Sequence, residues 1–168
     1  DVVQGEPSAF GSSPAEAMEN FARAQNGPDY TGNRQYSSTK AFSAWWSAAM
    51  ARRHPGSVRF YTVSPGANLG TNASRHATGG FKLMLGFMRR FGKLLGMDQP
   101  IDKGAGRYID VLHDNDGPYK NGGTYTSRPK KVTGPLTLSA PPHLTAIDRQ
   151  DTAMVLLDKL TNLHGEAS

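Results

Sequence analysis

Hydrophobic and polar residues follow a helical period over most of this chain and a strand-like pattern over one short segment. From Tyr36 to Arg53, apolar residues fall on two neighbouring helical stripes, which predicts a helix buried on more than one side. The segment VRFYTVSPG at 58–66 is β-branched and aromatic and stops at Pro65-Gly66, which predicts a strand. Further helices are expected at 13–26, 81–96, 102–114 and 145–165, with a short extended stretch at 123–127.

Two of these helices carry clear sequence signals. At the first, Ser13 is a candidate N-cap, Pro14 suits the first helical position, and Glu16 completes a capping box. Gly27-Pro28 would end that helix. The last helix is amphipathic and is expected to turn four residues toward a core: Met154, Leu157, Leu160 and Leu163.

The order of these elements favours an α/β fold. A buried strand flanked by helices is typical of a layer built on a parallel sheet. Only two strands are recognisable, however, and two strands are too few for such a sheet. We therefore expect the chain to be half of a domain, with the remaining strands supplied from elsewhere. A chain that begins at Asp1 rather than Met agrees with this expectation.

Composition excludes several classes of function. The net charge is +5, but basic residues cluster only as pairs, Arg52-Arg53, Arg89-Arg90 and Lys130-Lys131, without aromatic neighbours, so we expect no nucleic-acid partner. The absence of cysteine excludes disulfides, thiolate zinc sites and a cysteine nucleophile. The five histidines are scattered and lack metal-ligand spacing, so no metal site is expected. No apolar run is long enough to span a bilayer, and we expect a cytoplasmic protein.

Tyr36 and Lys40 are the candidates for chemistry. They stand four residues apart on the predicted helix, so their side chains leave the same face. A tyrosine hydroxyl normally titrates near ~10, and a nearby ammonium favours the phenolate form. Such a pair can act as a general acid and base. The spacing alone also fits an ordinary surface pair of a tyrosine and a lysine, which is the commoner role of such a pair.

The context of the pair resembles a known family. YSSTKAFSAWW at 36–46, the strand after it, VSPGANLGT at 63–71 and the later GTYTS resemble the C-terminal half of short-chain dehydrogenases/reductases, in the style of retinol-dehydrogenase-like members. The resemblance implies a Rossmann-type, doubly wound parallel sheet, of which residues 1–168 would form the C-terminal part of a single domain. It also implies an NAD(P)-dependent oxidoreductase that interconverts an alcohol and a carbonyl.

The same resemblance implies roles for individual residues. Tyr36 would exchange the proton with the substrate oxygen, and Lys40 would hydrogen-bond the nicotinamide ribose. The remaining cofactor-binding positions would be Pro65, Gly66 and Ala67 under the nicotinamide, the backbone near Asn68 at the carboxamide, and Thr71 at the carboxamide or pyrophosphate. Two positions depart from the family pattern, since Thr71 stands six rather than five residues after the proline and Asn68 replaces an aliphatic residue.

Two family features are missing from the sequence. No Gly-rich phosphate-binding turn follows a strand, so NAD and NADP are not distinguished, with NADP slightly favoured. The family's catalytic serine should end an apolar strand before the tyrosine. Ser12 and Ser13 are the paired candidates, but they follow no strand, and we expect that serine to precede Asp1.

Residues 72–96 would form the family's lid over the substrate. The lid would supply an apolar wall of Phe81, Met84, Leu85, Phe87, Met88 and Phe91, which implies a bulky hydrophobic alcohol or carbonyl substrate. The basic residues of this segment, Lys82, Arg89, Arg90 and Lys93, also suit peripheral contact with an anionic membrane. Simple packing on its own domain is the other interpretation of the segment.

Assembly and two rival functions complete the expectations. The resemblance implies a homodimer or tetramer through the 36–53 helix, where Trp45-Trp46 would be core or interface. The first rival function is a non-catalytic module of the same family that binds a partner or acts as a scaffold. The second is a lipid-surface binding protein that uses residues 81–96.

Overall fold

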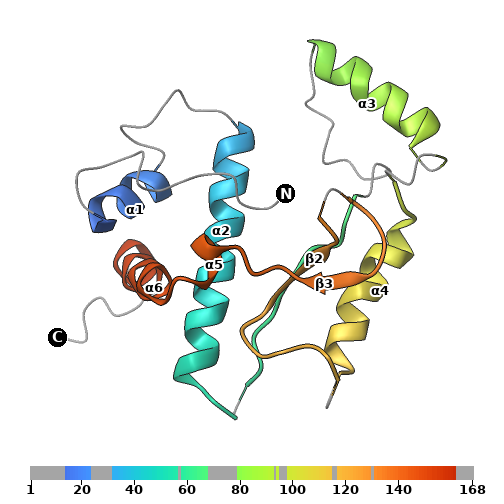
Figure 1. Ribbon diagram of the computed structural model, residues 1–168. Helices are drawn as coiled ribbons and strands as arrows, with labels where there is room; N and C mark the ends of the chain where they lie inside the picture. Colours follow the sequence, from blue (N-terminus) through green and yellow to red (C-terminus); the bar gives the residue numbers. More distant parts are fainter. Residues whose placement is uncertain are drawn as a thin grey trace. The chain divides into compact units, whose positions relative to one another are not determined.

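The computed structural model describes residues 14–23, 32–56, 58–67, 79–92, 94, 98–114, 117–129 and 131–161. The fold is mixed α/β (Figure 1). Its elements in chain order are α1 (Pro14–Arg23), α2 (Gly32–Arg53), β1 (Thr62–Val63), α3 (Gly79–Phe91), α4 (Ile101–Leu112), β2 (Thr124–Ser127), β3 (Leu136–Leu138), α5 (Pro142–Thr145) and α6 (Ile147–Thr161).

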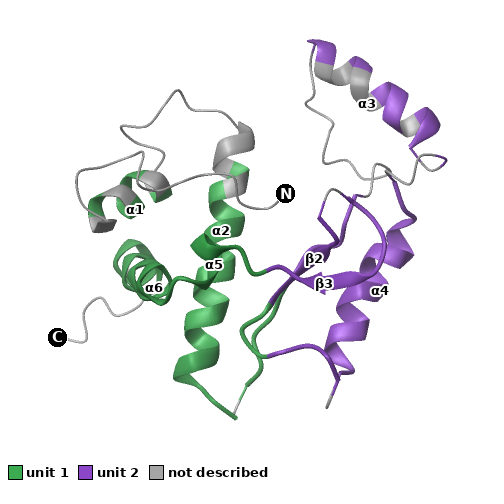
Figure 2. Cartoon of the chain, in the orientation of Figure 1, with its two compact units in different colours: residues 1–62, 121–123, 140–168 green, residues 63–120, 124–139 purple. Residues whose placement is uncertain are grey.

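The chain divides into two compact units (Figure 2). The first comprises Asp1–Thr62, Asn121–Gly123 and Ala140–Ser168, and it contains α1, α2, α5 and α6. The second comprises Val63–Lys120 and Thr124–Ser139, and it contains α3, α4 and the β2–β3 hairpin. The boundary runs through β1.

Helix α2 forms the centre of the first unit. Its buried residues include Ala41, Phe42 and Trp45, and they pack against Leu144 of α5 and residues of α1 and α6. Trp45 is fully buried, its ring meets Phe42 edge to face at 5.3 Å between centroids, and its Nε1 donates to the His143 carbonyl at 2.8 Å. The predicted helix over 36–53 is confirmed, as is its burial on more than one side.

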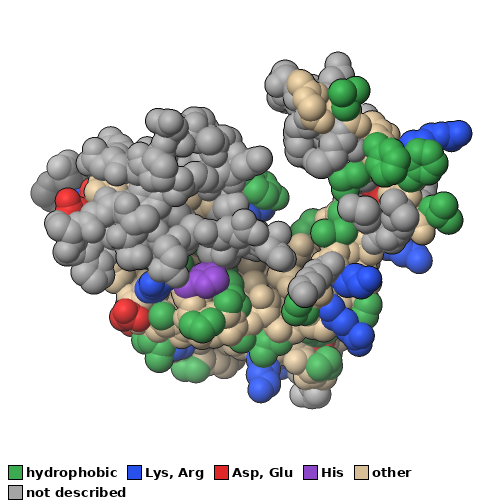
Figure 3. Space-filling view, turned by 45° about the horizontal axis from the view of Figure 1, so that its top comes forward, with side chains coloured by type: hydrophobic (Ala, Val, Ile, Leu, Met, Phe, Trp, Pro, Cys, Tyr) green, Lys and Arg blue, Asp and Glu red, His purple; other side chains and the backbone are tan. Residues whose placement is uncertain are grey.

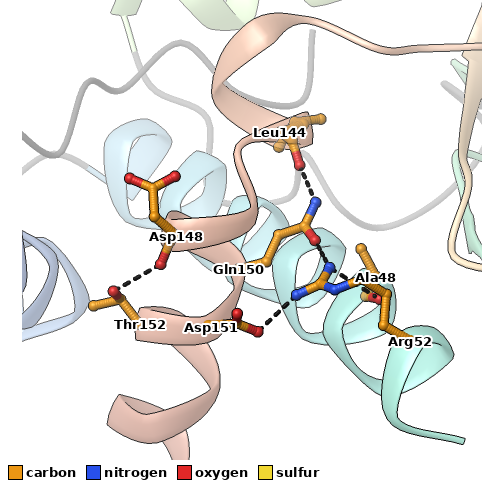
Figure 4. A network of polar contacts seen from close by, with 7 residues as sticks. All are labelled: Ala48, Arg52, Leu144, Asp148, Gln150, Asp151 and Thr152. Atoms are coloured by element: carbon orange, nitrogen blue, oxygen red, sulfur yellow. Dashed lines mark hydrogen bonds and ion pairs between the residues drawn. The ribbon is translucent and has the colours of Figure 1, made fainter.

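A polar network joins α2 to the C-terminal helices (Figure 4). Arg52 donates to the Gln150 side chain and to the Asp151 carboxylate, the latter at 2.6 Å. Gln150 is buried, and its Nε2 donates to the Leu144 carbonyl at 2.7 Å, just before α6 begins. The network therefore fixes the junction of α5 and α6 against the last turn of α2.

The sheet has the strand order β1-β2-β3. Bonds from Thr62 N to Gly123 O at 3.0 Å and from Ser64 N to Tyr125 O at 2.9 Å advance together along both strands, so β1 runs parallel to β2. β3 pairs antiparallel with β2, with Tyr125 opposite Leu138 and Ser127 opposite Leu136. The sheet is consequently mixed, not purely parallel.

Several element boundaries differ from the sequence expectations. The predicted strand at 58–66 is limited to Thr62–Val63, because sheet pairing stops at Ser64 and Pro65 has no N–H to continue it. The helix predicted to reach residue 96 ends at Phe91. β3 was not predicted, because three residues within a stretch rich in Gly and Pro carry too little pattern.

The last predicted helix begins two residues later than expected, at Ile147, and the short helix α5 before it was not predicted. Ala146, in an extended conformation, separates α5 from α6. Of the residues expected to face a core, Met154 is buried and Leu157 packs against the core cluster, whereas Leu160 is half-buried. Ser13 and Leu163 lie outside the described residues.

In the second unit, α4 and β2 supply the buried residues. Gly104, Arg107 and Val111 are buried along one stripe of α4, and Thr124, Tyr125 and Ser127 are buried on β2. A buried arginine in this small interior needs hydrogen-bond acceptors around it, and these acceptors define the candidate site below. Within the described residues, no helix combines the length and apolarity that crossing a bilayer requires.

Candidate functional site

Tyr36 and Lys40 meet on the first turns of α2. The Lys40 Nζ lies 5.2 Å from the centre of the Tyr36 ring, within cation–π range. Tyr36 is 65% exposed and Lys40 is half-buried. The next residue, Ala41, and Trp45 one turn later are fully buried. A solvent-accessible phenol beside an ammonium is thus held on a helix whose backbone is fixed by the core of the first unit.

The turn Ser64–Ala67 follows β1 in the second unit. Gly66 has a φ of +76°, a left-handed conformation that glycine adopts without strain. A Cβ at this position would lie 2.7 Å from Arg107 Nη1, 2.8 Å from Gln99 Nε2 and 2.9 Å from the Val132 carbonyl oxygen. Both the dihedral angle and the space therefore require glycine here.

Backbone hydrogen bonds fasten this turn on both sides. Ala67 N donates to the Val132 carbonyl at 2.8 Å, and Gln99 N donates to the Ala67 carbonyl at 3.1 Å. The Gln99 side chain also donates to the Pro65 carbonyl at 2.6 Å. Pro65 itself is exposed, so the turn presents a rigid apolar ring on a backbone that is already hydrogen-bonded.

Arg107 holds the turn from the α4 side. Its Nη1 donates to the Ser64 carbonyl and its Nη2 to the Ser127 hydroxyl, both at 2.9 Å, and Nη2 also donates to the Gly134 carbonyl. Arg107 is 5% exposed, and burial lowers the pKa of its guanidinium from the ordinary value. The three acceptors are neutral and come from the turn after β1, from β2 and from the loop before β3. Arg107 is therefore the residue that ties these three segments together.

Sequence reasoning missed both Arg107 and Gln99. A signal was present, since Arg107 shares an α4 stripe with Gly104 and Val111, so its position predicts burial. An arginine on an otherwise apolar or small-residue stripe indicates a buried hydrogen-bonding role. Gln99 carried no comparable signal.

A groove of about 710 Å3 lies beside Arg107 in the second unit, between α4 and residues 133–136. Its lining is charge-balanced, with Asp98 and Asp110 against Lys103 and Arg107. Tyr119 also lines it, and burial together with Asp110 and Asp114 raises the pKa of that phenol above its ordinary value. The groove consequently offers a protonated hydroxyl and paired charges, which suit a polar ligand better than a hydrophobic one.

The other expected site residues have mixed outcomes. Asn68 and Thr71 lie outside the described residues, as do the side chains of Phe81 and Leu85. Met88 of the expected lid is half-buried on α3. Tyr36 and Lys40 belong to the first unit, whereas Pro65, Gly66 and Ala67 belong to the second. The structure thus places Tyr36 beside Lys40 in the first unit, and Pro65, Gly66 and Ala67 in one turn of the second.

Each unit, taken by itself, offers a contact that suits one part of a dinucleotide. A lysine ammonium next to a phenol can donate to sugar hydroxyls, and the exposed Pro65 beside a crowded glycine offers a flat contact for a planar ring. The sequence contains no Gly-rich turn for the phosphates. Among the residues that the structure describes, no group of histidine and carboxylate side chains is arranged to bind a metal ion.

Comparisons with known proteins add no relative. No protein-family model matches the chain, and no curated protein matches it either. The family resemblance consequently rests on the motifs of the sequence, and the geometry of Tyr36, Lys40 and the 64–67 turn has to be interpreted by its chemistry.

Proposed function

We propose that this chain is the C-terminal, catalytic half of an NAD(P)-dependent short-chain dehydrogenase/reductase that interconverts a hydrophobic alcohol and its carbonyl. The proposal includes a Rossmann-type sheet and a Gly-rich phosphate turn supplied by another part of the complete protein or by a partner chain. The observation that carries it is the exposed Tyr36 phenol with the Lys40 ammonium 5.2 Å from its ring, on a helix fixed by a buried core.

In this proposal Tyr36 moves the proton. During reduction the Tyr36 hydroxyl donates its proton to the carbonyl oxygen as that oxygen gains negative charge, and solvent restores the proton afterwards. In the reverse direction the phenolate accepts the alcohol proton. Lys40 binds the nicotinamide ribose through its ammonium hydrogen-bond donors. The nicotinamide cofactor, when bound, supplies or accepts the hydride.

The 64–67 turn orients the cofactor in this proposal. A planar ring held against Pro65 needs a surface that does not move, because small displacements of reacting atoms cost large factors in rate. Arg107 and Gln99 fix the carbonyls of Ser64 and Pro65 from behind. They therefore act as positioning residues, whereas Tyr36 and Lys40 touch the substrate and the cofactor.

The test is a comparison of tyrosine variants in the complete protein. We expect Tyr36→Phe to lower kcat by about 10²- to 10⁴-fold with a hydrophobic aldehyde and NADPH or NADH. The Kd for the cofactor should change by less than about twofold, because a phenyl ring keeps the packing. Tyr108→Phe, at another exposed tyrosine, is the matched control and should keep full activity.

Two results would contradict the proposal. Turnover by Tyr36→Phe within about tenfold of wild type would remove Tyr36 from the catalytic role. Failure of the complete protein to bind either dinucleotide in a fluorescence titration would favour the alternative, a non-catalytic module with the same motifs.

A homodimer or tetramer through α2 belongs to the same proposal. The side of α2 that the first unit leaves exposed carries Thr39, Ser43 and Trp46, the last 37% exposed. Small residues around one aromatic ring would let two copies of the helix approach closely. A monomeric mass by light scattering at micromolar concentration would contradict this part of the proposal.

A further inference from the structure

Helix α3 carries an exposed apolar stripe that includes two of the expected lid residues, Phe87 and Phe91. Leu83 is 79% exposed and Phe87 is 59% exposed, and Phe91 continues the stripe at helical spacing. Leu94, also exposed, follows three residues after the last residue of α3. The Phe87 and Phe91 rings lie 4.9 Å apart and form a continuous apolar surface. Exposed apolar surface that is contiguous, unlike scattered single residues, indicates an interaction site.

Three of the expected lid residues are on a different side of this helix. Positions 81, 85 and 88 repeat at intervals of four and three residues, which places them on one face. Leu83 and Phe87 follow positions 81 and 85 by two residues each, and a two-residue step leads to another side of a helix. A substrate held under positions 81, 85 and 88 would therefore leave the stripe uncovered.

The charge of the segment around α3 indicates which kind of surface binds the stripe. Residues 63–97, which belong to the second unit and precede α4, contain five lysines and arginines and no aspartate or glutamate, although the chain as a whole has 14 acidic residues. Four of those basic residues lie between 82 and 93, and the described one on α3, Arg90, is exposed. Figure 3 shows hydrophobic and basic side chains together toward the right of the view, the side on which α3 lies in Figure 1.

We propose that α3 docks on an anionic lipid surface, with the stripe Leu83, Phe87 and Phe91, and Leu94 after it, entering the interface. A helix with Phe and Leu on one side and only basic charges beside them matches the physical requirements of an interfacial helix. Anionic headgroups attract each nearby Lys or Arg, and the acid-free segment offers no repulsion. The proposal does not depend on the oxidoreductase activity, because it needs neither Tyr36 nor a cofactor.

The test is flotation of the complete protein with phosphatidylcholine vesicles, with and without about 30% phosphatidylserine. We expect binding to the serine-containing vesicles at about 0.1 M salt and its loss at about 0.5 M, where screening is stronger. Leu83→Gln/Phe87→Gln should weaken binding by about 100-fold, because two large apolar side chains no longer enter the interface. Arg90→Glu should weaken it by about fivefold or more.

Matched controls keep the experiment specific. Ile109→Gln/Leu112→Gln removes two exposed apolar residues from α4 instead, and Arg53→Glu reverses an exposed charge on α2. Both controls should bind like wild type. Circular dichroism of all variants checks that helix content is unchanged.

Three outcomes would overturn the proposal. The first is absence of binding to anionic vesicles, or equal binding to neutral ones. The second is wild-type vesicle binding by Leu83→Gln/Phe87→Gln. The third is a dimer that forms without vesicles and is lost in that double variant, which would mean that a second copy covers the stripe.

Discussion

Gly66→Ala is the substitution for which the structure makes the sharpest prediction. The alanine Cβ would meet Arg107 Nη1 at 2.7 Å, Gln99 Nε2 at 2.8 Å and the Val132 carbonyl oxygen at 2.9 Å. All three atoms belong to the hydrogen bonds that fasten the turn. Making room for the methyl group therefore requires breaking or stretching those bonds.

The expected cost has two parts. A non-glycine residue at φ +76° costs about 1 kcal/mol. Loss of the charged bond from Arg107 to the Ser64 carbonyl costs about 2 kcal/mol, and loss of the neutral bond from Gln99 costs about 1 kcal/mol. Gly66→Ala should accordingly lower the free energy of unfolding of the second unit by about 4 kcal/mol.

Gly56→Ala is the matched control. Gly56 has a φ of +83°, and no atom lies within 4 Å of the Cβ that alanine would add, so only the dihedral cost of about 1 kcal/mol applies. Urea unfolding gives the global cost of each substitution. Amide hydrogen exchange at Ala67 and Gln99, whose N–H groups bond within the turn, reports the local effect.

Equal losses for Gly66→Ala and Gly56→Ala would refute the crowding argument. A second check uses a double-mutant cycle with Gln99→Ala, which removes one of the three atoms near the new methyl group. Gly66→Ala should cost about 1 kcal/mol less in that background than in wild type. Full additivity would mean that Gln99 does not confine the turn.

Three further predictions concern stability. The wild-type protein should lose stability above about pH 10, because burial and Asp110 raise the pKa of Tyr119 above its ordinary 10.0. Tyr119→Phe should abolish this loss, as measured by urea unfolding against pH. Because the pKa is raised, the stabilisation from the neutral Tyr119 hydroxyl is complete below about pH 10 and is lost progressively as pH rises through the folded-state pKa. A variant with wild-type alkaline behaviour would contradict this prediction. Gln150→Leu should lower the free energy of unfolding by about 1–3 kcal/mol, because the buried Leu144 carbonyl loses its donor. Asp151→Asn, at the exposed end of the same network, should cost less than about 1 kcal/mol, and equal effects would contradict the distinction. Gly106→Ala should stabilise the protein by about 1 kcal/mol, because α4 gains helix propensity and no atom lies within 4 Å of the new methyl; a lower melting temperature would show that the position is crowded.

Local sequence signals were sufficient for most of the helices. The apolar stripes predicted α2 and its wide burial, and the Pro-Gly pair predicted the end of β1. The four-residue spacing predicted that Tyr36 and Lys40 lie side by side, because that contact depends only on helix geometry. These features are decided within a few residues of chain, where the pattern of side chains and the backbone preferences agree.

Tertiary structure decided what depends on partners distant in sequence. Arg107 is buried because acceptors at Ser64, Ser127 and Gly134 converge on it, and no local pattern specifies that convergence. β3 is a strand because Tyr125 and Ser127 offer it backbone partners, although its short sequence predicted no element. Hydrogen-bond satisfaction of buried groups is a property of the assembled interior. The sequence by itself therefore determined most of the helices and the Tyr36–Lys40 pair, and the fold alone decided how the 64–67 turn is held.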